Sequence, residues 1–153
     1  MLSTIVYPKG MVFPSRLKRL SVSADGIRYH LKKRRGHSCW WLNFKVRRFK
    51  VSMDIYTSPS VKSIQVNGYS WFYNYPDRGW FLEDAEGLPS NGLPEEVATI
   101  VNNALQAIAP ALRQARQAEA LEDQINRDKA KQAHQRELAK KQRHFSRVLQ
   151  QLR

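Results

Sequence analysis

The sequence predicts an α+β protein: an antiparallel β-meander of about five to six strands, packed by one helix and followed by a long C-terminal helix. Three observations lead to this class. Apolar and polar residues alternate with period two through much of residues 18–82, which is the pattern of half-buried strands. Residues 94–110 carry apolar side chains at helical spacing. Residues 111–153 contain no glycine or proline and consist mainly of good helix formers.

The first part of the sheet is expected to consist of short strands. Two of them are predicted within residues 3–13, on either side of a turn at residues 8–10, where proline and glycine interrupt the chain. A third is predicted over residues 18–23. The turn at residues 24–26 contains Asp-Gly, which is a strong local signal for a hairpin, so residues 27–32 are expected to form the returning strand.

A long strand is predicted over residues 40–55, after a basic turn at residues 33–36. Its alternation changes phase by one residue at Arg47-Arg48. A β-bulge supplies one extra residue and bends the strand, so it accounts for the change. A tight turn at the same place is the alternative.

The second hairpin is predicted from Asn67-Gly68, because this dipeptide favours the positive φ angles of a type I′ turn. Residues 61–66 and 69–75 are its two strands. A turn at residues 76–79 then leads to a short strand at residues 80–82.

The helix that packs on the sheet is expected to begin at Pro94, with Glu95 and Glu96 in its first turn, where the helix dipole favours negative charge. Pro110 is expected to end or kink it, because proline lacks a backbone donor and clashes with the preceding turn. We therefore predict a basic β-sheet domain over residues 1–110 and an extended basic helix over residues 111–153. The apolar stripe expected to face the sheet consists of Val97, Ile100, Val101, Ala104, Leu105 and Ile108.

Charge is distributed unevenly along the chain. Its 153 residues have a formal net charge of +13. Residues 1–82 hold 15 Lys and Arg against 3 Asp and Glu, residues 83–125 hold 2 against 8, and residues 126–153 hold 9 against 2. Such an asymmetry suggests that the three segments have separate tasks. The commonest partner of a strongly basic domain is the phosphate backbone of a nucleic acid.

The basic residues of the sheet lie at period two on the polar faces of adjacent predicted strands. We expect this face to bind nucleic acid, because such a surface matches a row of phosphates and releases counterions on binding. The alternative is a solvated face that only keeps the protein soluble, which requires less one-sided charge. The predicted nucleic-acid-binding residues are Arg16, Lys18, Arg19, Arg28, Lys32, Lys33, Arg34, Arg35, Lys45, Arg47, Arg48 and Lys50, together with Trp41.

Trp41 is included because it follows Trp40 directly, so the two indoles point to opposite faces of a regular strand. Trp40 belongs to the apolar row, which places Trp41 on the basic side, where a base can stack on it. The aromatic row of residues 69–75 on odd-numbered positions is interpreted instead as core.

The C-terminal stripe Leu138, Phe145, Leu149 and Leu152 is predicted to contact a protein partner or a second copy of the chain, although the basic tail that carries it is also a candidate for nucleic-acid binding. A helix lying on a membrane surface is disfavoured by the narrow apolar face.

No catalytic site is expected. Cys39 is the single cysteine, in an apolar strand, and the four histidines lack the spacing of a zinc site. We predict no enzyme activity, no cofactor and no metal. A cytoplasmic location is expected, because one cysteine cannot form a disulfide within the chain and no secretory signal or membrane-length apolar run is present.

The sequence therefore predicts a non-catalytic accessory protein that binds DNA or RNA. The alternative is a phage or mobile-element protein that inhibits or adapts a host nucleic-acid machine, such as a defence complex, through protein contacts.

Overall fold

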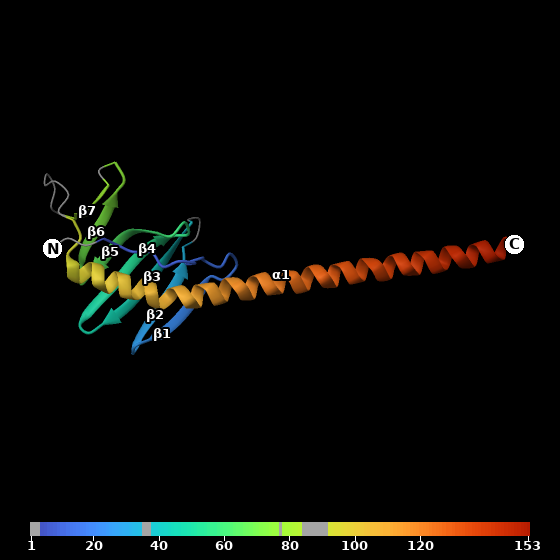
Figure 1. Ribbon diagram of the computed structural model, residues 1–153, viewed down its shortest axis with the longest axis horizontal. Coiled ribbons are helices and arrows are strands. Elements are labelled where there is room, and N and C mark those ends of the chain that lie inside the picture. Colours follow the sequence, from blue (N-terminus) through green and yellow to red (C-terminus); the bar gives the residue numbers. More distant parts are fainter. Residues whose placement is uncertain (1–3, 35–37, 77, 84–91) are drawn as a thin grey trace. The chain divides into compact units, whose positions relative to one another are not determined.

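The computed structural model describes residues 4–34, 38–76, 78–83 and 92–153. The chain divides into two compact units, Met1–Arg116 and Gln117–Arg153. The first contains the sheet and the beginning of the helix, and the second contains the rest of the helix (Figure 1).

The sheet is a meander in which every strand is antiparallel to its neighbours in sequence, which confirms the predicted α+β class. It has seven strands, one or two more than expected. They are β1 (Arg19–Ala24), β2 (Ile27–Lys33), β3 (Cys39–Val46), β4 (Phe49–Tyr56), β5 (Ser60–Val66), β6 (Tyr69–Asn74) and β7 (Gly79–Leu82).

The long strand predicted over residues 40–55 is two strands, β3 and β4. Val46 pairs with Phe49, so Arg47 and Arg48 form the tight turn between them, and Arg47 has a φ of 53°. The tight turn is therefore correct and the bulge is not. An irregularity does occur one strand further along, between β4 and β5, where the pairing shifts beside Ile55.

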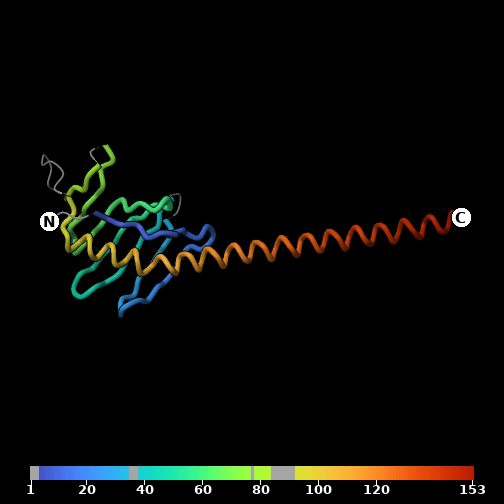
Figure 2. The backbone as a smooth tube through the Cα atoms, in the orientation of Figure 1, coloured from blue at the N-terminus to red at the C-terminus, as the bar shows by residue number. Residues whose placement is uncertain are grey.

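Residues 4–18 form no strand, so the short strands predicted within residues 3–13 are wrong for the described part of that range. Hydrogen bonds between side chains and backbone groups hold this segment instead of strand pairing. Asn102 accepts a hydrogen bond from the Val6 amide at 2.9 Å and donates one to the Thr4 carbonyl at 3.1 Å. The hydroxyl of Tyr7 accepts one from the Val61 amide at 2.8 Å. Figure 2 shows the segment running alongside the first part of the helix.

Helix α1 (Glu95–Gln151) covers one face of the sheet with the first part of its length (Figure 1). The predicted stripe is buried there, apart from Ile100, which is partly buried. Its side chains form one core with Trp40, Leu42 and Ile55 of the sheet, which are fully buried. Burial of these large apolar side chains is the main source of stability in this unit.

Pro110 does not end the helix, which continues to Gln151. Pro110 is exposed, and so is Gln106, the residue whose carbonyl loses its helical donor at the proline. Ile108, Ala109 and Leu112 are buried on either side of it, and this packing offsets the cost of the proline. The domain boundary expected at residue 110 stays a prediction.

Over the described ranges, no helix has both the length and the apolar character that crossing a bilayer requires.

Candidate nucleic-acid interface

The face of the sheet opposite α1 is polar and basic. In β2, Tyr29 and Leu31 are buried, whereas Arg28, His30 and Lys32, which alternate with them, are exposed. The same alternation in the neighbouring strands places exposed cations on this side. The cations of β1 to β4 on this open face are Arg19, Arg28, Lys32, Lys45 and Lys50.

Two pairs of these cations lie directly opposite each other on adjacent strands. Arg19 pairs with Lys32, and Lys45 pairs with Lys50. Like charges in directly opposed positions destabilise a sheet by about 0.2–1 kcal/mol per pair. An anion bound between the two members of a pair would reduce this repulsion.

One cross-strand row extends over all seven strands on this face. It begins with Arg19 and Lys32, passes through Trp41 and Asp54, and ends on Phe72 and Phe81. In order, the row is Arg19, Lys32, Trp41, Asp54, Ser63, Phe72 and Phe81. The row is thus basic at one end and aromatic at the other, where the rings of Phe72 and Phe81 stack with centroids 5.8 Å apart.

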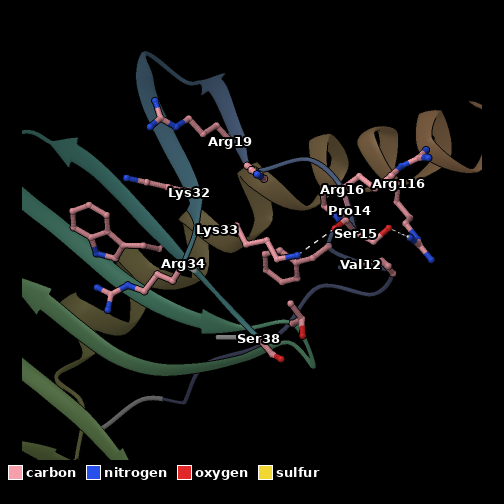
Figure 3. A pocket seen from close by; sticks show the side chains of 14 residues that line it. Val12, Pro14, Ser15, Arg16, Arg19, Lys32, Lys33, Arg34, Ser38 and Arg116 are labelled. Carbon is pink, nitrogen blue, oxygen red and sulfur yellow. Dashed lines mark hydrogen bonds between the residues drawn. The ribbon is translucent and has the colours of Figure 1, made fainter. Parts of the chain in front are cut away.

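The basic end of the row opens into a groove of about 1170 Å³. Segments that are far apart in sequence meet there: residues 12–19, residues 32–34, the start of β3 and the last turn of the first unit's helix (Figure 3). No Asp or Glu is present among the described residues that line the groove. Its cations are Arg16, Lys18, Arg19, Lys32, Lys33, Arg34 and Arg116.

Ser15 holds two of these cations in place. Lys33 donates from Nζ to the carbonyl of Ser15 at 3.2 Å, and Arg116 donates from Nη1 to its hydroxyl at 3.1 Å. Figure 3 shows Lys33 directed toward Ser15, whereas Arg19 and Lys32 extend to the other side, over the open face. Within the described chain, the side chains of Arg19 and Lys32 form no hydrogen bond or ion pair, so their donors are available to a ligand.

Arg34 lies between the groove and the row. Its guanidinium carbon is 5.9 Å from the centre of the Trp41 ring, which is a cation–π distance. Its Nε lies 3.3 Å from Oδ1 of Asp54, and Ser63 donates its hydroxyl to Oδ2 of the same carboxylate at 3.0 Å. Asp54 therefore offsets part of the positive charge beside Trp41.

Trp41 and Trp40 differ in their surroundings. Trp40 is completely buried and stacks on Phe13 with centroids 5.7 Å apart. Trp41 is partly exposed, lies opposite Lys32 and Asp54, and lines the groove. Only the second indole is placed where a ligand can contact it.

The remaining predicted cations lie outside the groove. Lys45, Arg47, Arg48 and Lys50 surround the β3–β4 turn, at the other end of β3, and Arg28 lies on the open face of β2. The described basic residues therefore form two areas, one at the groove and one around the β3–β4 turn. Arg35 lies outside the described residues.

Arg116 and Ser15 are groove residues that sequence reasoning missed. Arg116 lies in the acidic stretch of the chain and joins the groove only because the helix packs on the sheet. The aromatic residues of positions 69–75 were interpreted mostly as core, and only Trp71 is buried, whereas Tyr69, Phe72 and Tyr75 are exposed. The polar neighbours Ser70 and Asn74 at the same spacing were the signal that Phe72 is on the open face.

Cys39 is buried, and burial raises the pKa of its thiol, with a further increase from the negative charge of Asp54. A thiol kept protonated in this way is a poor nucleophile. Within the described ranges, no three His, Cys, Asp or Glu side chains gather as the ligands of a metal ion would.

The second unit exposes the apolar side chains predicted to bind a partner. Leu138, Phe145 and Leu149 are 51%, 61% and 40% exposed, and Leu152, just beyond the end of α1, is 78% exposed.

Comparisons of the chain with protein families, with curated proteins and with solved structures gave no match. Function is therefore inferred from the residues of this site.

Proposed function

We propose that this protein is a nucleic-acid-binding accessory protein that holds phosphates in the basic groove and does not catalyse a reaction on them. The observation that supports this most strongly is the groove itself, where seven cations from separate chain segments converge and no acid is present among the described lining residues. The proposed role of each group follows from its contacts.

Arg19 and Lys32 would contact phosphates directly, because they repel each other in the free protein and extend over the open face. Lys33 and Arg116 would supply positive charge from fixed positions, since Ser15 holds both. Preorganised donors lower the entropic cost of binding. The cations around the β3–β4 turn would extend the contact along the same face.

Salt dependence tests this function. Binding of a labelled oligonucleotide, followed by fluorescence anisotropy, should weaken by about tenfold or more between about 50 and 200 mM salt, because each neutralised phosphate releases condensed counterions. An affinity that does not change with salt would contradict the proposal.

Charge-removing variants locate the interaction. Arg19→Gln combined with Lys32→Gln should weaken binding by about 10- to 100-fold and reduce the slope of log affinity against log salt by about one to two. Lys9→Gln combined with Arg78→Gln is the matched control, because it removes two exposed cations that do not line the groove. Equal losses in the two double variants would show that only net charge matters.

A second candidate function is docking on a protein of a nucleic-acid machine. The exposed Leu138, Phe145 and Leu149 of the second unit favour it, because large apolar side chains on a helix face are typical of helix recognition. Substituting all three with alanine should abolish such docking and leave oligonucleotide binding to the groove unchanged, which separates the two functions.

A further inference from the structure

A second, smaller hollow lies on the open face next to the groove. Its volume is about 330 Å³, which is at the lower end of the range of about 300–1,000 Å³ for sites that bind small ligands. It shares Arg19, Lys32 and Trp41 with the groove. Trp41 therefore borders both hollows, with Arg34 near its ring.

The rest of the smaller hollow is lined by two apolar residues, Leu20 and Leu31, and by three polar ones. Ser21, His30 and Asn43 line it, and they are exposed cross-strand neighbours on β1, β2 and β3. The hydroxyl of Ser21 lies 3.3 Å from Nδ1 of His30, within hydrogen-bonding distance. Hydroxyl, imidazole and amide groups can donate to and accept from the edge of a heterocycle.

This hollow thus combines the three contacts that a nucleotide requires. Trp41 offers a ring on which a base can stack, the polar groups in the same hollow can hydrogen-bond the edge of that base, and Arg19 and Lys32 can hold the phosphate. Recognition of unpaired bases by stacking on aromatic side chains of a sheet, with hydrogen bonds to the base edge, is the common mode for single strands.

We propose, building on the nucleic-acid binding proposed above, that the ligand is a single strand and that one of its bases stacks on Trp41 in this hollow while its backbone continues into the basic groove. A duplex does not fit this arrangement, because its bases are already stacked on each other and Trp41 lies within the sheet surface, where it cannot reach between them.

The test compares three ligands on the intact protein at one salt concentration: a single-stranded DNA of about 10 nucleotides, the same strand with all its bases removed, and the duplex of the same length. The first and second carry the same phosphates, so only base contacts distinguish them. We expect the normal strand to bind about tenfold or more tightly than the abasic strand, and more tightly than the duplex.

Trp41→Ala should weaken binding of the normal strand by about 5- to 150-fold and leave binding of the abasic strand nearly unchanged, because stacking is lost and the phosphate contacts remain. Trp41→Phe should keep most of the affinity. Phe72→Ala is the control, because Phe72 is an exposed aromatic residue of the same face that lines neither hollow. Its affinity for the normal strand should stay within about twofold of the unsubstituted protein, because β6 and β7 carry no Lys or Arg to hold a strand there.

Equal affinity for the normal and abasic strands would overturn this inference and leave the proposed phosphate binding intact. So would a duplex that binds as tightly as the single strand, or an equal loss on all three ligands in Trp41→Ala. If none of the three ligands binds, phosphate binding itself is wrong. The ligand comparison with the unsubstituted protein decides the question even where a variant fails to fold.

Discussion

Asp54 on β4 forms an ion pair with Arg34 beside the ring of Trp41, with 3.3 Å between Oδ1 and Nε. The carboxylate is 24% exposed and the guanidinium side chain 49% exposed, so solvent screens the pair only in part. An acid in the middle of a basic face lowers the local positive potential and directs Arg34 over the indole. It therefore opposes the nucleic-acid binding that we propose for its neighbours.

Asp54→Asn should bind oligonucleotides more tightly than the natural chain. The change removes one negative charge and releases Arg34, and the amide oxygen can still accept the hydrogen bond from Ser63. An exposed pair of this kind contributes about 0.2–1 kcal/mol, so we expect a gain in affinity of about 1.5- to 5-fold. Asp25→Asn, in the β1–β2 turn, removes the same charge away from the groove. Isothermal titration that gives the two variants equal affinities would contradict a specific role of Asp54.

Lys45→Glu should stabilise the fold and weaken binding. Lys45 lies directly opposite Lys50, so the change replaces a repulsive pair with an attractive one, and we expect a gain of about 0.2–1 kcal/mol in the free energy of unfolding. Denaturation in urea measures it, and Lys45→Gln should give about half of the gain. A loss of stability in Lys45→Glu would show that the two ammonium groups do not repel each other in the folded chain.

Asn102→Ala should loosen the N-terminal segment. The Asn102 amide is hydrogen-bonded to the backbone of both Val6 and Thr4, and these bonds are exposed, so water takes the place of the lost side chain and we expect a cost of about 0.5–1.5 kcal/mol. Limited proteolysis should then cut the variant first within residues 4–10. Asn103→Ala is the control, since Asn103 is the next residue of α1 and is exposed. Equal stability of the two variants would contradict this role.

Cys39 should make stability fall at alkaline pH. Its pKa in the folded chain is raised above the usual value near 9.0, so folding favours the neutral thiol. This contribution is fully present below the pKa of the unfolded thiol and is lost as pH rises through the higher pKa of the folded state.

The free energy of unfolding should therefore fall more between about pH 8 and pH 10 in the natural chain than in Cys39→Ala. Burial also raises the pKa values of Tyr7 and Tyr29, but these groups are present in both proteins, so the difference between the two slopes isolates the thiol. Parallel pH profiles would show that the environment of Cys39 does not favour its protonated form.

Local patterns in the sequence were sufficient to predict most of the fold. Alternation located the strands, because a strand with one buried face repeats every two residues. Asn67-Gly68 located a turn, with Asn67 at a φ of 48° and its side chain accepting a hydrogen bond from the Lys50 amide at 2.8 Å. The stripe from Val97 to Ile108 identified the helix face that is buried in the core.

The same patterns gave wrong predictions where the hydrogen-bond partners of a segment lie far from it in the sequence. Residues 4–18 have apolar residues that resemble strands, but the hydrogen-bond partners of their backbone include the side chains of Asn102 and Arg113, about a hundred positions away. Arg47-Arg48 fits a bulge or a turn equally well in sequence, and only the pairing of Val46 with Phe49 distinguishes them.

By itself, the sequence determined that this chain forms a basic sheet with Trp41 on its charged side, because the direction of a side chain in a strand depends only on its position along the strand. Only the tertiary structure decided which charges meet. Strand register places Lys32 beside Trp41 and Trp41 beside Asp54, and the packing of α1 adds Arg116 to Arg16 and Lys18 in one groove. These contacts depend on how segments distant in sequence are brought together, and no local pattern encodes that.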